Sequence, residues 1–289
     1  MKMKLLAAAS VLAMTATAAV AAPSFYINVG SNSYQSAKNT QDADSNTGTF
    51  TEFGFNQLLA TSVYDLSDNS VNGAFYDTNL ASDFAKLGIA RSDTAMDGVT
   101  TVNLTYPTVG QVNIDSLAPL VPPSFGSDAE GYNDSWHLEV RYRFNGVMSA
   151  SGPSYTGGTW ELFFNDFTNN ANDRVVVSGH LVGSELQVAN LNLFLEVDSA
   201  EAGFLFIDDG FGNFSAVGDG TKFNLDTNVF PPIPTASQLL EFVDGDGNRV
   251  AVRQTKLDGT ISGVIPEPAS LALVGLGFAG LFAARRRKA

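Results

Sequence analysis

The sequence of 289 residues contains no cysteine and only two histidines. Without cysteine the chain forms no disulfide bond, thiolate metal site or cysteine nucleophile. Basic residues are also scarce, since 16 Lys and Arg stand against 30 Asp and Glu. Because such an acidic surface repels phosphate backbones, the composition predicts that the protein binds no nucleic acid.

Motifs of the common enzyme classes are missing as well. The chain has no G-x-S-x-G, HExxH, Walker or Rossmann glycine pattern, so nucleophilic, zinc and nucleotide chemistry lack a starting point. His137 and His180 both lie in predicted strands, where a structural role is the simpler interpretation. Glu139 and Glu161 could face each other as the carboxylates of glycoside hydrolases do, but any acidic sheet protein offers such pairs. We therefore expect that the protein is not an enzyme.

The first 21 residues (1–21) have the three parts of a secretory signal peptide. Two lysines precede an apolar run over residues 5–20, which finishes in the small residues Ala19-Val20-Ala21. Cleavage between Ala21 and Ala22 is expected, because a cut one residue later would place Pro23 directly after the scissile bond. The sequence thus predicts an exported protein that signal peptidase releases with Ala22 as its new N-terminus.

The other end of the chain also consists of three parts in a fixed order. Pro266-Glu267-Pro268 comes first, an uncharged run over residues 269–284 follows, and Arg285-Arg286-Arg287-Lys288 closes the series. As a helix the run would rise about 24 Å, slightly less than the ~30 Å hydrocarbon core of a bilayer. The basic cluster would remain in the cytoplasm as a stop-transfer signal by the positive-inside rule. We therefore predict a single C-terminal transmembrane helix, with the body of the chain outside the membrane.

In this order of parts, residues 263–289 resemble the PEP-CTERM sorting domain, which consists of Pro-Glu-Pro, a short apolar helix and a terminal arginine cluster. The resemblance implies that an exosortase is a partner and recognises Pro266, Glu267 and Pro268. It also implies a Gram-negative bacterium that makes exopolysaccharide. The expected path of the protein therefore leads through an inner-membrane intermediate to the cell surface or the extracellular matrix.

The body of the chain, residues 22–262, is rich in short segments of alternating polarity with β-branched or aromatic residues. In Trp136–Phe144 every even position is apolar, whereas the odd positions include His, Glu and two Arg, which indicates one buried and one wet face. We predict an all-β domain, an antiparallel β-sandwich of jelly-roll or Greek-key type. Its expected strands are Phe50–Phe55, Val99–Tyr106, Trp136–Phe144, Thr159–Phe164, Arg174–Leu181, Leu191–Val197, Phe204–Ile207, Gly220–Leu225, Gln238–Val243 and Arg249–Gln254.

Some segments depart from the strand pattern. Two proline-rich stretches, Ala118–Phe125 and Phe230–Pro234, are expected to be loops or edge strands. Leu80–Leu87 is the best helical candidate because Asp83, Phe84 and Leu87 recur at helical spacing, and Asn56–Ala60 is a second, weaker one. Neither helix would organise the fold.

The most site-like segment of the body is the turn Asp244-Gly-Asp246-Gly-Asn248, because alternate oxygen-bearing side chains can converge on Ca²⁺. Compared with an EF-hand loop it has Arg249 where glycine is needed and Thr255 where a bidentate Glu is needed. A solvated hairpin turn is therefore the favoured interpretation. Weak Ca²⁺ binding stays open as the one cofactor hypothesis, since the body alone keeps 10 basic against 29 acidic side chains.

Two classes of function remain. A structural protein of the cell surface or matrix, associated with exopolysaccharide, biofilm or floc formation, is favoured by a loose resemblance of the acidic, glycine-rich body to floc- and biofilm-associated members of the PEP-CTERM group. The alternative is a carbohydrate-binding or carbohydrate-active β-sandwich delivered by the same route. It would use a sugar-stacking platform of exposed rings, for which the candidates are Tyr132, Trp136, Tyr155 and Trp160. Core packing is the favoured interpretation of these rings.

Overall fold

The structure, a computed structural model, describes residues 23–31, 34, 44–87, 118–121, 125, 128–188, 190–228 and 231–264. The predicted signal peptide, the predicted C-terminal helix and the predicted strand Val99–Tyr106 lie outside the described residues. Within these residues, no helix has both the length and the apolar character needed to span a membrane.

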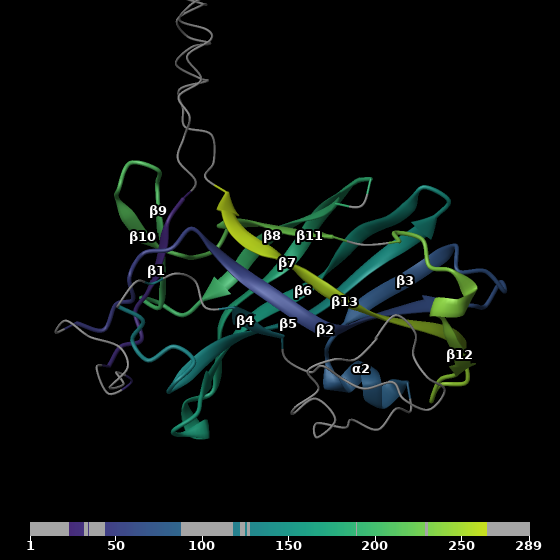
Figure 1. Cartoon of the computed structure of the whole chain (residues 1–289), viewed down its shortest axis with the longest axis horizontal. Helices are drawn as coiled ribbons and strands as arrows, with labels where there is room; N and C mark the ends of the chain where they lie inside the picture. Colours follow the sequence, from purple (N-terminus) through teal and green to yellow (C-terminus); the bar gives the residue numbers. More distant parts are fainter. Residues whose placement is uncertain are drawn as a thin grey trace, which may run out of the picture.

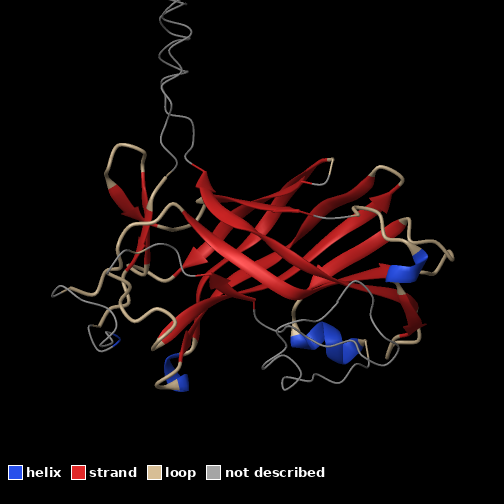
Figure 2. Cartoon of the chain, in the orientation of Figure 1, coloured by secondary structure: helices blue, strands red, loops and turns tan. Residues whose placement is uncertain are grey.

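Strands make up most of the described chain, and the helices are short (Figure 2). The elements in chain order are β1 (Phe25–Ile27), β2 (Glu52–Asp65), β3 (Gly73–Thr78), α2 (Ala81–Lys86), β4 (Ala118–Val121), β5 (Trp136–Ser149), β6 (Gly152–Asp166), η3 (Asn170–Asn172), β7 (Arg174–Gln187), β8 (Asn190–Ala200), β9 (Leu205–Asp208), β10 (Phe214–Ala216), β11 (Lys222–Asn228), η4 (Ala236–Gln238), β12 (Leu240–Val243) and β13 (Arg249–Val264).

The predicted alternation in β5 is confirmed. Trp136, Leu138 and Phe144 are buried, while His137, Arg141 and Arg143 between them keep partial exposure. Because successive side chains of a strand point to opposite faces, the even residues fill the interior and the odd residues form the outer surface. β5 pairs along its whole length with β6, placing Tyr142 opposite Trp160 in the core.

The main sheet has ten strands, all paired antiparallel, and it closes on itself because β2 bonds to β13. Following the pairings gives a ring in the order β2, β3, β5, β6, β7, β8, β11, β13 and back to β2. β3 and β4 occupy successive stretches of the slot between β2 and β5. β12 pairs with the N-terminal part of β13, whereas β11 pairs with its C-terminal part. Figure 1 shows β2 and β13 crossing in front of β5, β6 and β7, so the ring has two facing layers. The prediction of an all-β, antiparallel, sandwich-like fold is confirmed.

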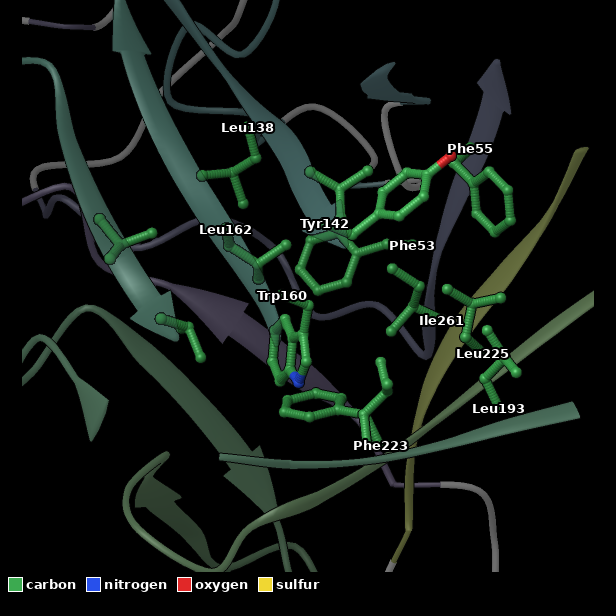
Figure 3. Packing of buried hydrophobic residues seen from close by; sticks show 14 of the residues in the cluster. Phe53, Phe55, Leu138, Tyr142, Trp160, Leu162, Leu193, Phe223, Leu225 and Ile261 are labelled. Carbon is green, nitrogen blue, oxygen red and sulfur yellow. The ribbon is translucent and has the colours of Figure 1, made fainter. Parts of the chain in front are cut away.

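Aromatic side chains dominate the space between the two layers. Trp160 contacts Phe223 edge-on with ring centroids 5.7 Å apart, and Phe223 stacks on Phe25 at 5.8 Å. Figure 3 shows the indole nitrogen of Trp160 beside the ring of Phe223, with Ile261, Leu225 and Leu193 on the facing strands. Large buried rings contribute most of the apolar area that stabilises such a core.

A second, three-stranded sheet closes one end of the ring. Its strands run in the order β1-β9-β10, and β1 carries Phe25 and Ile27, both fully buried, into the main core. Backbone hydrogen bonds between Phe25 and Phe50 join the small sheet to the segment that leads into β2. The two sheets therefore share one hydrophobic core.

The helix prediction at Leu80–Leu87 is confirmed by α2. This helix packs on the outer face of the main sheet, where Phe84 joins a separate cluster with Val63 and Val252. Asp83 anchors it by accepting hydrogen bonds from Thr78 Oγ1 at 2.7 Å and from the Arg143 guanidinium. The helix therefore covers the sheet without organising it.

Two sequence expectations are corrected by the pairing. Asn56–Ala60 is not helical but forms part of β2, because it pairs with residues 255–258 of β13, a partner about 200 positions away in the chain. Residues 118–121 of the first proline-rich stretch form neither a loop nor an edge strand, since β4 pairs with β2 on one side and β5 on the other. Each of these pairings involves only two residue pairs, so the missing donor of Pro119 costs little.

Candidate functional sites

The residues predicted to direct export and sorting lie outside the described residues: Ala19, Ala21, Ala22, Pro266, Glu267, Pro268, Arg285, Arg286, Arg287 and Lys288. The structure instead describes the residues that flank them. Pro23 comes directly after Ala22, the predicted new N-terminus, and Val264, the last residue of β13, is separated from the Pro-Glu-Pro motif by one residue, Ile265.

These two flanks meet at the same end of the ring, which we call the terminal pole and define by Pro23, β1 and the end of β13 at Val264. A β-carbon on Gly263 would lie 2.6 Å from Phe25 Cζ and 2.8 Å from Ile207 Cδ1, so β13 passes directly against the small sheet. Figure 1 shows the ends of β1 and β13 close together on one side of the molecule. The described chain thus enters and leaves the fold at one pole.

Several turns of the main sheet gather at the opposite end, which we call the hairpin pole. The antiparallel register places there the turns that connect β2 to β3, β5 to β6, β7 to β8, and β12 to β13. The described residues of these turns are 66–72, 150–151, 188 and 244–248. A strand of about 15 residues spans roughly 50 Å at 3.3 Å per residue, so the two poles are well separated.

The proposed Ca²⁺ ligands Asp244, Asp246 and Asn248 lie in one of these turns. Asp244 Oδ1 accepts hydrogen bonds from the backbone N–H of Asp246 at 3.0 Å and of Asn248 at 2.8 Å, while Asn248 Nδ2 donates to Oδ2 at 3.2 Å. The backbone hydrogen bond from Asn248 is the main cause that lowers the pKa of Asp244. The described part of the chain contains no group of three or more His, Cys, Asp or Glu side chains arranged to hold a metal ion.

Each histidine pairs with a carboxylate. His137 Nε2 lies 2.7 Å from Glu139 Oε1, and His180 Nδ1 lies 2.8 Å from Asp198 Oδ1 on the exposed face. Asn165 Nδ2 also donates to Glu139 Oε1 at 2.9 Å, so this buried carboxylate is held in place by two neighbouring groups.

The acidic pair considered for glycoside hydrolysis lies on adjacent strands, as the sequence suggested, but not face to face. Glu139 of β5 is opposite Phe163, whereas Glu161 of β6 is opposite Arg141. The Arg141 guanidinium in turn lies 3.5 Å above the Phe163 ring, so a cation and an aromatic ring occupy the positions across from the two carboxylates.

The four aromatic residues considered as a sugar-stacking platform are all buried, which confirms the favoured interpretation of core packing and excludes the alternative of an exposed platform. Trp136 stacks on Phe164 with centroids 5.2 Å apart and donates its Nε1–H to Glu130 O at 2.7 Å. Tyr132 packs edge-on against Trp136 at 4.8 Å. Tyr155 and Trp160 lie inside the ring. Trp136, Tyr155 and Trp160 lie in strands at inward-facing positions, so core packing explains their spacing.

One buried carboxylate holds a turn at the terminal pole. Asp166, the last residue of β6, is fully buried and accepts hydrogen bonds from Tyr34 Oη at 2.9 Å and Asn172 Nδ2 at 2.7 Å on Oδ2. Its Oδ1 accepts from the backbone and the hydroxyl of Thr168. Burial raises the pKa of Asp166, but the hydrogen bonds from Asn172, Thr168 and Tyr34 outweigh burial, so the pKa lies well below the ordinary value. This arrangement suits a structural anchor, because every donor favours the charged form.

The interior of the ring contains polar groups that the sequence analysis missed. Tyr155 Oη donates to Asp77 Oδ2, and Tyr142 Oη donates to Gln57 Oε1 at 2.7 Å. Burial raises the pKa of Asp77 and raises that of Tyr155 well above its ordinary value. A sequence signal existed, because Gln57 continues the inward-facing positions of Phe53 and Phe55 in β2, where the period of two predicts an apolar residue.

Comparison with protein-family models finds one match. Residues 264–288 match the model described as the PEP-CTERM protein-sorting motif, which confirms the interpretation of the C-terminal segment. Comparison with curated proteins finds none whose sequence matches the chain. The match begins at Val264, the residue at which β13 ends, so the motif follows the folded body without an intervening segment.

Proposed function

We propose that this chain is a non-catalytic structural protein of the cell surface or extracellular matrix. It carries the PEP-CTERM protein-sorting motif at residues 264–288 and is therefore an exosortase-targeted secreted protein. In this proposal the protein associates with exopolysaccharide and contributes to biofilm or floc formation. The motif carries the proposal, because it indicates export through a membrane-anchored intermediate. The β-rich body supplies a stable unit for such a location.

The position of the motif supports a simple order of events. Signal peptidase would cut before Ala22, and the C-terminal helix would then hold the chain in the inner membrane. Only Ile265 separates Pro266 from the end of β13 at Val264, so the terminal pole would face the membrane and the exosortase at this stage. Because Pro266 and Pro268 have a fixed φ and no backbone N–H, we expect the recognition segment to be extended, which would leave Glu267 open to an enzyme cleft.

The non-catalytic part of the proposal is supported by how the carboxylates of the body are used. Asp83 holds a helix, Asp166 holds a turn, and Asp244 accepts hydrogen bonds from its own loop. Glu139, the most buried member of the acidic pair, is bonded to His137 and Asn165. Groups that are committed to structural hydrogen bonds are poorly placed to exchange protons with a substrate.

The sorting step is tested with Glu267→Ala in the producing bacterium. We expect the variant to accumulate in the inner-membrane fraction with its C-terminal segment intact, as detected by immunoblotting and mass spectrometry of the C-terminus. Glu185→Ala, at an exposed position of β7 near the hairpin pole, is the matched control and should be processed as the wild type is. Normal processing of Glu267→Ala would show that this glutamate is not read by the exosortase.

The matrix role is tested by deleting the gene and scoring floc and biofilm formation. We expect aggregation to fall and to be restored by the wild-type gene but not by the Glu267→Ala gene. Unchanged aggregation in the deletion strain would contradict the matrix role while leaving the sorting step intact. The carbohydrate-active alternative is tested separately, because a catalytic body would release reducing sugar from a panel of polysaccharides, whereas a structural body would not.

A further inference from the structure

We propose that the interior of the ring is a binding site for one small neutral molecule that has an apolar body and a hydroxyl group. This site is independent of the sorting motif and of the matrix role. It rests on a cavity between the two layers of the main sheet and on buried polar atoms in the cavity wall that lack a partner in the protein.

The cavity measures about 60 Å³ as the space open to the centre of a water molecule. One water needs roughly 10–15 Å³ of such space, so the cavity has room for several waters or for an organic molecule with a similar number of heavy atoms. Its wall comes from seven strands of the ring, and the side chains include Tyr142, Trp160, Leu193, Leu225 and Ile261. Figure 3 shows these side chains pointing toward one another from opposite layers.

Most of the cavity wall is aliphatic or aromatic, so the ligand should be apolar over most of its surface. Phe55, Phe75, Phe144 and Leu257 contribute carbon surface from four different strands. Water gains few hydrogen bonds on such a surface, and a sugar would leave most of its hydroxyls unpaired there. An apolar body fits because it loses no hydrogen bonds on entering.

The polar atoms of the cavity wall indicate which functional group the ligand should carry. Gln57 is 1% exposed, its Oε1 accepts from Tyr142 Oη, and its Nε2 is buried without a hydrogen-bond partner. The same holds for Asp77 Oδ1, whose companion Oδ2 accepts from Tyr155 Oη. A buried polar atom without a partner costs about 1–3 kcal/mol, which a correctly placed ligand group recovers.

A hydroxyl group suits either position. It can accept a hydrogen bond from Gln57 Nε2 or donate one to Asp77 Oδ1, whereas a carbonyl can only accept. A charged ligand fits poorly, because transferring an ion from water into a largely apolar cavity costs far more than transferring a neutral alcohol. The chemistry of the wall therefore selects a neutral alcohol over a fatty acid, an amine or a sugar.

The test uses the folded full-length body and 1-hexanol as the probe, measured by isothermal calorimetry and by the shift of the melting temperature. We expect saturable binding of one molecule of 1-hexanol and no binding of glucose or hexanoate. Absence of a saturable signal for 1-hexanol would mean that the cavity holds only water, and the proposal would fail.

Three variants locate the site. Leu193→Phe on β8 and Leu225→Phe on β11 each fill the cavity from a different strand, and each should weaken 1-hexanol binding at least tenfold. Val182→Phe adds the same ring at an exposed position of β7 and should leave binding unchanged. If Val182→Phe weakens binding as much as the two cavity variants do, the alcohol binds elsewhere. Because two cavity variants are used, failure of one to fold still leaves the other.

A fourth variant tests the role of Gln57. Gln57→Leu removes the amide, so it should weaken 1-hexanol roughly three- to tenfold, the range expected for one hydrogen bond. The same variant should leave binding of 1-chlorohexane unchanged, because this molecule has a similar shape and no hydroxyl. Equal effects on both probes would assign Gln57 a packing role and would refute the selection of a hydroxyl.

Discussion

Pro23 lies against Gly263, so closely that a β-carbon at residue 263 would come within 3.0 Å of Pro23 Cγ. The first residues of the folded body are therefore packed on the strand that leads into the sorting motif. The predicted signal-cleavage site and the sorting motif therefore both adjoin the terminal pole, the first beside Pro23 and the second beside the end of β13.

Gly263 is expected to tolerate no side chain. Gly263→Ala would force its new methyl group against Phe25, Ile207 and Pro23, and overpacking of this kind costs about 1–3 kcal/mol. Urea unfolding of the purified body measures the loss. Gly157→Ala on β6 is the matched control, because a β-carbon there meets no atom within 4 Å. Equal stability of the two variants would disprove the close contact at the terminal pole.

Asp166 is expected to make the fold sensitive to acid. Its folded pKa lies below the ordinary value of 3.8, so its stabilising contribution is complete above that value and is lost as the pH falls toward the folded pKa. At pH 7, Asp166→Asn should lower the free energy of unfolding by about 2–3 kcal/mol, because hydrogen bonds to a charged group are lost. The difference from wild type should shrink below pH 4. Asp198→Asn, at a largely exposed carboxylate, should change little.

Asp77 is expected to make the fold less stable as the pH rises, which is the opposite of the effect of Asp166. Burial raises its pKa, although the nearby hydroxyls of Ser62 and Tyr155 and the charge of Arg253 oppose burial. The folded state then holds the proton more tightly than the unfolded chain does, so stability falls as the pH rises from 3.8 through the folded pKa. Asp77→Asn should remove this fall. Unfolding free energies measured between pH 3 and pH 8 would count against the prediction if the variant and the wild type gave parallel curves.

Val188 is expected to be a site of stored strain. It lies in the β7–β8 turn at the hairpin pole with a φ of 60° and a side chain that is 93% exposed. A left-handed conformation costs a β-branched residue about 1–2 kcal/mol, and asparagine adopts it more readily. Val188→Asn should therefore raise the free energy of unfolding by about 1 kcal/mol. Val182→Asn, at an exposed position within β7, should not, and a gain in both variants would point to surface polarity as the cause.

The Asp244 turn is expected to hold its shape without calcium. Its carboxylate already accepts hydrogen bonds from Asp246 and Asn248, which supports a self-contained hairpin turn. About 5 mM Ca²⁺, above the ~10⁻³ M limit of weak extracellular sites, should leave the melting temperature unchanged. A rise with Ca²⁺ but not Mg²⁺, abolished by Asp244→Asn, would establish a calcium site instead.

The strands that the sequence predicted best are those whose pattern is local. In β5 the alternation from Trp136 to Phe144 was sufficient, because one buried face imposes a period of two. β2 was harder, since residues 56–60 take their strand conformation from β13, about 200 positions later. Short strands such as β1 and β10, with three residues each, carry too few positions for any period to show.

The candidate sites also differ in whether their residues are close together in the sequence. The sorting motif is a linear segment that an enzyme reads residue by residue, so its order in the sequence was enough to identify it. The cavity is assembled from seven strands, and no spacing in the chain relates Gln57 to Leu193 or Ile261. A polar residue at an inward-facing position was the only local trace of that site.

Closure of the main sheet also limits how copies of the protein can join. The eight strands of the ring each pair with neighbours on both sides, so they present few free N–H and C=O groups to another chain. Growth of a fibre by adding strand to strand, as in cross-β polymers, needs such a free edge. A matrix that contains this protein would therefore gain cohesion from contacts of the outer side chains with the surrounding polymer, and the ring itself would remain a discrete, non-polymerising particle.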